Sequence, residues 1–169
     1  MTLKKILIAG ALMVTAVFGT GATVSYYEEG LPGTMNPLFA GSMVDRRSHE
    51  LVFDRLFFHD AITNELKSRV VERTELVNDG KGIKLILKEG IKWHSGKALT
   101  SKDVCFTVNA MLNRRTASTV AENYREVLAS CKTQGAQVAV IEFRKVFHNP
   151  REQLGFHVLP QEAFSSTAI

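Results

Sequence analysis

The strongest structural signals in the chain lie in residues 78–104, which read NDGKGIKLILKEGIKWHSGKALTSKDV. The opening Asn-Asp-Gly favours a tight turn, because these residue types tolerate the backbone conformations that hairpin turns require. A strand-like run at residues 69–77 precedes the turn, and apolar side chains occupy every second position from Ile83 to Leu87. Such spacing is typical of a strand with one buried face. The pattern therefore predicts a β-hairpin whose second strand is broken at Gly90.

A helix is predicted directly after this hairpin and the loop at residues 94–97. Thr100 is a favourable N-cap residue, and Asp103 three positions later suits the positive end of a helix. The apolar residues that follow recur at i, i+4, i+7 and i+8, which places them on one face. They are Val104, Val108, Met111 and Leu112. We expect this face to pack against the core.

The rest of the chain gives weaker signals, but they have the same mixed character. Ser42 and Asp45 resemble a capping box at the start of a helix. The expected elements are a strand over 23–27, a helix over about 43–56, a short helix or turn over 122–128, a strand that includes Cys131, a strand over 138–146, and a short helix from cap Asn149 through about Gly155. Hairpins mixed with helices predict α/β or α+β layers around one core.

The first 22 residues have the composition of a secretory signal. Lys4 and Lys5 precede an apolar run of 13 residues from Ile6 to Phe18, and small residues follow at 20–22. This order is typical of a signal peptide, and the run is short for a membrane span. We expect cleavage after Ala22 and no stable membrane span afterwards; an uncleaved anchor or a buried helix is the alternative.

Export changes the interpretation of the two cysteines, Cys105 and Cys131. An even number of cysteines in a chain bound for an oxidising compartment favours a disulfide. The alternative is two separate buried thiols that behave as small apolar residues. A metal site is not expected, because the two sulfur atoms lie 26 residues apart without a Cys-x-x-Cys motif.

Composition and motifs argue against nucleic-acid binding and against catalysis. The net charge is +4, or +2 without Lys4 and Lys5, and basic residues are mixed with acidic ones along the chain. A nucleic-acid site would need a basic patch. The five histidines form no His-Glu-x-x-His motif, and no glycine-rich phosphate loop is present. We therefore expect no enzyme activity, no cofactor and no metal, with a secreted hydrolase as a distant alternative.

Several segments together resemble extracellular solute-binding protein family 5, the periplasmic oligopeptide- and dipeptide-binding type. The segments that carry the resemblance are residues 30–38, 51–56, 78–104 and 158–164. They occur in the order expected for the family over most of the mature chain. Two departures are Ala98 and Ser101, which stand where the family usually has Pro and Ala.

The resemblance implies a fold, a function and a location. The fold is α/β, the N-terminal portion of lobe I of a type II periplasmic-binding-protein fold, with a mixed sheet, hairpins and flanking helices. Residues 23–169 would be a partial, truncated lobe I without the second lobe. The function is capture of a peptide or similar small solute in the periplasm for an ABC importer and its inner-membrane permease. An exported interaction module and a non-functional remnant of a longer binding protein are the alternatives.

The resemblance also implies a ligand-binding segment at the edge of the lobe. Its residues are Tyr26, Glu28, Glu29, Gly30, Leu31, Pro32 and Gly33. Backbone groups in this segment would pair with an extended peptide as an added strand. Glu28 or Glu29 would face a basic side chain of the solute, or would be a solvated surface carboxylate. Trp93 and His94 are expected to fix packing and a turn.

Overall fold

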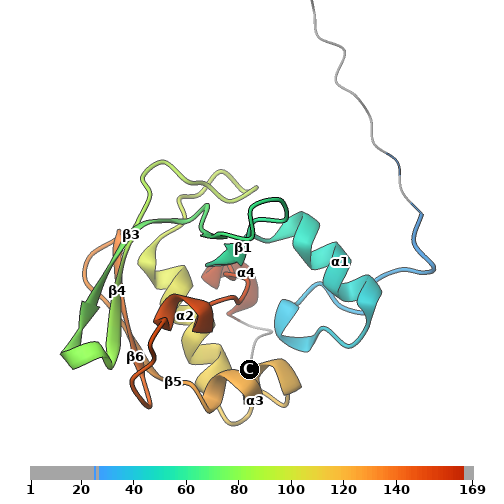
Figure 1. Ribbon diagram of the computed structural model, residues 1–169. Helices are drawn as coiled ribbons and strands as arrows, with labels where there is room; N and C mark the ends of the chain where they lie inside the picture. The colour runs from blue at the N-terminus through green and yellow to red at the C-terminus, as the bar shows by residue number, and fades with distance from the viewer. Residues whose placement is uncertain (1–24, 26, 166–169) are drawn as a thin grey trace, which may run out of the picture.

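A four-stranded antiparallel sheet carries the core in the part of the chain that the structure describes, residues 25 and 27–165 of a computed structural model (Figure 1). Its spatial order is β3-β4-β6-β5. The strands are β3 (Val71–Val77), β4 (Gly82–Leu87), β5 (Leu128–Thr133) and β6 (Val138–Phe143). The pairings of β3 with β4 and of β5 with β6 each contain one register shift. Helices flank this sheet, which confirms the α/β class.

The predicted hairpin is confirmed in detail. Its turn is η2 (Asn78–Gly80), in which Asn78, Asp79 and Gly80 have φ values of 53°, 52° and 81°. These left-handed conformations are the ones that Asn, Asp and Gly adopt most easily. The alternating apolar side chains of β4 are buried, with Leu85 fully inaccessible to solvent.

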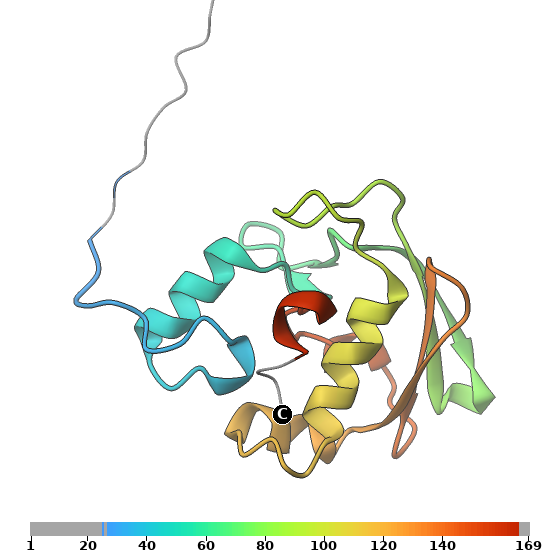
Figure 2. The same cartoon turned by 180° about the vertical axis from the view of Figure 1, so that it is seen from behind.

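Helix α2 (Ser101–Leu112) lies between the sheet and the other helices, as the two opposite views in Figures 1 and 2 show. It packs against β5, β6, α3 (Thr119–Arg125) and α4 (Gln161–Phe164). Thr100 and Asp103 form the predicted capping box. The predicted apolar face is confirmed, because Val104, Val108 and Met111 are fully buried.

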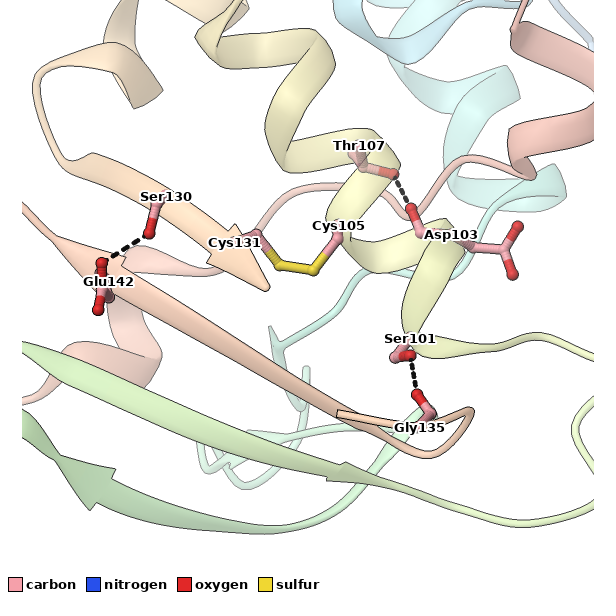
Figure 3. Close-up of a disulfide and its surroundings, with 8 residues drawn as sticks. All are labelled: Ser101, Asp103, Cys105, Thr107, Ser130, Cys131, Gly135 and Glu142. Atoms are coloured by element: carbon pink, nitrogen blue, oxygen red, sulfur yellow. Dashed lines mark hydrogen bonds between the residues drawn. A yellow bond between two sulfur atoms is a disulfide. The ribbon is translucent and has the colours of Figure 1, made fainter. Parts of the chain in front are cut away.

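A disulfide joins α2 to the sheet. Cys105 on α2 and Cys131 on β5 are bonded, with 5.1 Å between their Cα atoms (Figure 3). The Ser101 hydroxyl makes a second connection by donating to the carbonyl of Gly135 at 2.6 Å. The helix is therefore fastened to β5 by a covalent bond and to the β5–β6 turn by a hydrogen bond.

Helix α1 (Met43–Val52) is shorter than the sequence predicted. It ends at Val52, and Phe53 already has extended dihedral angles, so the prediction of a helix to residue 56 is wrong. Distant partners explain the early end. The amide of Leu56 donates to the carbonyl oxygen of Phe156 at 2.8 Å. The amide of Phe57 donates to the carbonyl oxygen of Leu154 at 3.2 Å.

The other predicted elements differ mainly in their bounds. The strand predicted over 138–146 ends at Phe143. The short helix predicted from cap Asn149 through about Gly155 is the shorter 3-10 helix η3 (Pro150–Gln153). A further 3-10 helix, η1 (Pro37–Phe39), precedes α1. Of the strand predicted over 23–27, only Ser25 and Tyr27 are described, and neither is in a strand. The signal peptide predicted over 1–22 lies outside the described residues.

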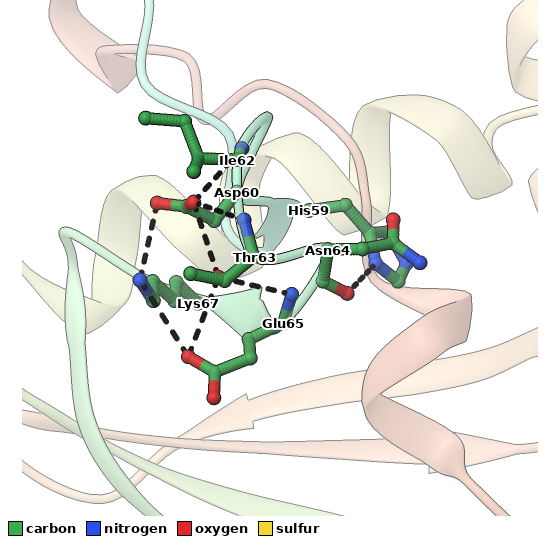
Figure 4. A network of polar contacts seen from close by, with 7 residues as sticks. All are labelled: His59, Asp60, Ile62, Thr63, Asn64, Glu65 and Lys67. Atoms are coloured by element: carbon green, nitrogen blue, oxygen red, sulfur yellow. Dashed lines mark hydrogen bonds and ion pairs between the residues drawn. The ribbon is translucent and has the colours of Figure 1, made fainter.

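A small hairpin, which the sequence did not predict, follows α1. Its strands are β1 (Phe58–His59) and β2 (Leu66–Lys67), and its loop is organised by the Asp60 carboxylate (Figure 4). That carboxylate accepts hydrogen bonds from the amides of Thr63 and Ile62 and from the Lys67 ammonium group. These contacts, led by the Thr63 amide, hold the pKa of Asp60 well below its usual value. Asp60 is therefore a loop-forming residue.

Candidate functional site

The segment expected to bind the solute is an exposed loop that leads into η1 and α1. Tyr26 lies outside the described residues. Glu29, Gly30 and Gly33 are exposed, and Leu31 is 93% exposed. Glu28 and Pro32 are half-buried. Among the described residues, no backbone–backbone hydrogen bond involves residues 27–32. The described chain thus leaves the backbone groups of this loop without main-chain partners.

The two glutamates of this loop have different environments. Both side-chain oxygens of Glu28 are bound by Arg47 of α1, at 2.7 Å from Nε and 2.8 Å from Nη2. The Glu28 side chain is only 16% exposed. Such two-point pairing is the strongest arrangement that arginine makes with a carboxylate. The charge of Glu28 is therefore paired with that of Arg47, whereas Glu29 faces solvent.

Asp45, at the start of α1, organises the chain that follows the loop. Its carboxylate accepts hydrogen bonds from three amides, those of Gly33 at 2.7 Å, Ser42 at 2.9 Å and Gly41 at 3.0 Å. The Asp45 side chain is buried, and burial alone would raise its pKa. The amides of Ser42, Gly33 and Gly41 outweigh burial and lower the pKa of Asp45 to about 2. The residue is consequently ionised over the physiological pH range.

His49 holds the next residue of the segment. Its Nε2 atom lies 2.8 Å from the carbonyl oxygen of Thr34. A carbonyl oxygen can only accept, so Nε2 carries the hydrogen in this contact. His49 is 1% exposed, and its ring packs edge-on against Phe53 and His157, with centroid distances of 6.1 and 6.3 Å.

A polar cluster lies behind α1, where the chain comes back at residues 155–157. Arg55 donates to Glu50 at 2.7 Å and to the carbonyl of Gly155 at 2.8 Å. His157 Nε2 lies 3.4 Å from Glu50 and has no hydrogen-bond partner among the described residues. Burial, with the nearby Arg55 guanidinium, lowers the pKa of His157 to about 4. His157 is therefore uncharged at neutral pH.

Trp93 and His94 line a separate cavity of about 820 Å³ between the C-terminal end of α1, the turn at 93–98 and α4. His94 is exposed, while the Trp93 Nε1 atom is buried without a hydrogen-bond partner among the described residues. The Trp93 backbone closes the turn, because its amide donates to the carbonyl of Lys97 and its carbonyl accepts from Gly96, both at 2.8 Å. This position agrees with a role in packing and turn formation.

A smaller cavity of about 420 Å³, with a charged lining, lies beside the β1–β2 hairpin.

Sequence reasoning found the exposed loop but missed the side chains that hold it. Asp45 was expected only as a capping residue, and no role toward the loop was predicted for Arg47 or His49. Asp45 and His49 stand four residues apart and so share one face of the predicted helix, and that spacing was the available signal. Within residues 25 and 27–165, no cluster of three His, Cys, Asp or Glu side chains is suited to hold a metal ion. No helix in the same described part is long and apolar enough to cross a membrane.

Comparison with known proteins supports one family. Residues 65–166 match the family described as Bacterial extracellular solute-binding proteins, family 5 Middle. The dipeptide-binding protein of Escherichia coli K12 is 30% identical over 108 residues, which are 60% of this chain and 20% of that protein.

Solved structures show the same fold. The oligopeptide-binding protein AppA of Bacillus subtilis, in complex with a nonapeptide, has a TM-score of 0.72 at 21% identity, over 82% of this chain and 27% of AppA. The ABC transporter substrate binding protein CtaP of Listeria monocytogenes has a TM-score of 0.69 at 23% identity, over 82% of this chain and 28% of CtaP. The chain thus spans between a fifth and about 28% of the length of these relatives. With the family match covering more than half of its residues, the chain belongs to the bacterial extracellular solute-binding proteins of family 5.

Proposed function

We propose that this chain is the solute-binding component of an ABC importer, or part of one, and that it captures peptides or similar small solutes. Family membership supports a binding role outside the cytoplasm. The names of the relatives favour peptides as the solute class, and one of them is named as an ABC transporter component. The proposed partners are the solute and an inner-membrane permease.

The observation that carries the proposal is the state of residues 27–33. Their backbone is free of main-chain hydrogen bonds within the described chain, while both ends of the loop are fixed by α1 side chains. A held loop whose backbone groups have no main-chain partners is suited to bind the backbone of an extended peptide. We assign the solute contact to Tyr26, Glu29, Gly30, Leu31, Pro32 and Gly33, and a supporting role to Glu28.

We expect the affinity of the 169-residue chain alone to be low. Small-molecule sites bury most of the ligand surface, and this loop offers one wall only. The cost of immobilising the ligand is incurred in full even when half of its surface remains in solvent. The dissociation constant for short peptides should be no tighter than about millimolar, near −4 kcal/mol.

Nuclear magnetic resonance titration of the mature chain with a tri- to pentapeptide mixture tests the proposal. The expected result is a set of concentration-dependent shifts concentrated in the amides of residues 27–33. The absence of any shift at about 10 mM peptide, ten times a millimolar constant, would contradict solute contact by this loop in the chain alone. Micromolar binding by a monodisperse monomer would show that this loop and its neighbours form a complete site.

An exported interaction module is the second candidate, and exposed apolar side chains favour it. Tyr27 is 88% exposed, Leu31 93% and Leu51 67%. Exposed apolar side chains of this kind are the groups through which an association surface would bind a partner. Sedimentation analysis of the purified chain separates the two functions: concentration-dependent association without peptide-induced shifts supports the interaction module.

A further inference from the structure

The cavity of about 820 Å³ beside Trp93 has the dimensions of a small-molecule site. Three segments form it: the end of α1, the turn at 93–98 with the start of α2, and α4 with its flanking residues. Most of its lining surface is apolar, and the apolar lining residues are Val52, Phe53, Trp93, Ala98, Pro160 and Ala163. Small-molecule pockets have volumes of about 300–1,000 Å³ and mainly apolar walls with a few polar groups. Among the described residues, those at 27–33 do not line it, so the cavity is separate from the loop proposed to bind solute.

Contacts between the walls fix the shape of this cavity. Lys97 of the turn forms an ion pair with Glu162 of α4. Phe53, just after α1, meets Phe164 of α4 edge-on, with 6.0 Å between the ring centroids. Figure 2 shows α4 beside α2, which supplies the third wall. Because the walls are already joined, a ligand that enters loses little binding free energy to ordering of the protein.

The charged side chains of the lining leave one cation unpaired. Lys97 and Glu162 neutralise each other. The Asp103 carboxylate accepts backbone amides with both of its oxygens. The ammonium group of Lys102, by contrast, is exposed and has no ion-pair or hydrogen-bond partner among the described residues. Lys102 also lies in the first turn of α2, where the helix dipole adds partial positive charge. This end of the cavity therefore favours a negative group on the ligand.

We propose that the cavity binds a compact aromatic carboxylate, with its ring against Trp93 and Phe53 and its carboxylate at Lys102. Aromatic rings attract one another in offset and edge-on arrangements, beyond the gain from burying their area. Hydrogen bonds of the Trp93 backbone to Lys97 and Gly96 close the turn, so the indole is placed before the ligand arrives. The assignment does not depend on the proposed capture of solute by the loop.

Trp93 supplies a specific signal for the test. It is the single tryptophan of the chain, so its indole N–H gives the one tryptophan side-chain signal in a proton–nitrogen correlation spectrum. Naphthoate is the probe, and naphthylmethylammonium, which carries the opposite charge on the same ring, is the matched control. We expect naphthoate to shift the indole signal saturably, and the ammonium probe to bind at least about fivefold more weakly because it meets Lys102. Equal affinities, or no shift at about 10 mM naphthoate, ten times a millimolar constant, would overturn the proposal.

Two substitutions in the lining test where the probe binds. Ala163→Phe fills part of the cavity from α4, and Lys102→Glu reverses the charge at the start of α2. Lys132→Glu, on an exposed residue of β5, makes the same charge change away from the cavity and is the control. We expect naphthoate to bind about tenfold more weakly to Ala163→Phe, about fivefold more weakly to Lys102→Glu, and normally to Lys132→Glu. Full affinity in either lining variant would overturn the proposal. Circular dichroism checks folding, and Ala98→Phe, which fills the cavity from the turn, replaces Ala163→Phe if that variant does not fold.

Other occupants of the cavity give different results in the same spectra. A second copy of the chain would move the indole signal as the protein concentration rises without probe. A peptide site would give a saturable indole shift with trialanine at the affinity of naphthoate. Either result overturns the assignment to an aromatic carboxylate. The amides of residues 27–33 report on the proposed function, so failure of that function and failure of this cavity site appear in different signals.

Discussion

The carboxylate of Asp103 accepts a hydrogen bond at 2.9 Å from the backbone amide of Gln161, 58 residues further along the chain. Its other oxygen accepts the amide of Thr100 at 2.9 Å. One side chain of α2 thus caps the beginning of both α2 and α4. Thr107 adds a second connection, because its hydroxyl donates to the carbonyl of Asp103 and accepts the amide of Leu159. The C-terminal segment is therefore held to α2 by side chains that lie one turn apart.

Replacing Asp103 should destabilise the fold and release α4. Asp103→Ala removes the acceptor for two amides, and the residue is only 8% exposed. We expect a loss of about 1–3 kcal/mol in the free energy of unfolding, from one lost cap and one amide that loses its charged acceptor. Urea denaturation measures this loss. Lys102→Ala, on the exposed neighbouring residue, is the control and should stay within about 0.5 kcal/mol of wild type. Equal midpoints for the two variants would show that the Asp103 contacts do not stabilise the fold.

Reduction of the Cys105–Cys131 disulfide should also lower stability. The bridge closes a loop with a sequence separation of 26 residues. In the chain-entropy account, a loop of this size stabilises by about 3–4 kcal/mol. Urea denaturation of the oxidised chain and of the Cys105→Ser/Cys131→Ser variant gives the difference. Alkylation without reductant, followed by mass spectrometry of envelope-derived protein, determines whether the bond forms in the cell. Two freely alkylated thiols would contradict the prediction.

Acid should destabilise the chain through His157. Burial lowers its pKa to about 4, so between pH 6.5 and 4 the unfolded chain binds a proton that the folded chain does not. The stabilisation is fully present above pH 6.5 and is lost as the pH falls to about 4, on the order of 3 kcal/mol at most. Urea denaturation at several pH values, compared between wild type and His157→Gln, isolates this contribution. The exposed His148 supplies the control, His148→Gln, which should keep the wild-type pH dependence. Parallel pH profiles for wild type and His157→Gln would disprove the assignment.

Export should remove the first 22 residues. The charged, apolar and small-residue regions at the N-terminus favour cleavage after Ala22. Amino-terminal sequencing and intact mass of protein from the envelope fraction should give a chain that begins at Thr23. Protein that still begins at Met1 and remains in the cytoplasm would refute both the signal peptide and the periplasmic location.

The sequence predicted those elements whose signals are local. The hairpin around Asn78–Gly80 depends on turn residues and on alternation within a few positions, and α2 depends on its cap and its apolar face. Both are found where expected. Neighbouring residues alone determine such features, so they are readable without knowledge of the rest of the chain.

Features that depend on distant partners were not predictable. Helix α1 stops at Val52 because residues 56 and 57 pair with the chain about 100 positions later. The support of the candidate loop by Arg47 and His49 depends in the same way on how α1 lies against residues 28–34. Periodicity shows which face of a helix is apolar but not which loop a polar side chain on it will meet.

The register shifts in the sheet bear on how the chain avoids aggregation. Strands β3 and β5 are the outermost strands, and an outermost strand with free backbone groups can recruit a strand from another molecule. Irregular pairing interrupts both: between Val71 and Arg73 in β3, and between Leu128 and Ser130 in β5. Exposed charges lie on β3 at Glu72 and Arg73, and the disulfide at Cys131 fastens β5 to a helix. These devices disfavour intermolecular β-pairing while the chain folds, when partly folded molecules are most exposed to one another.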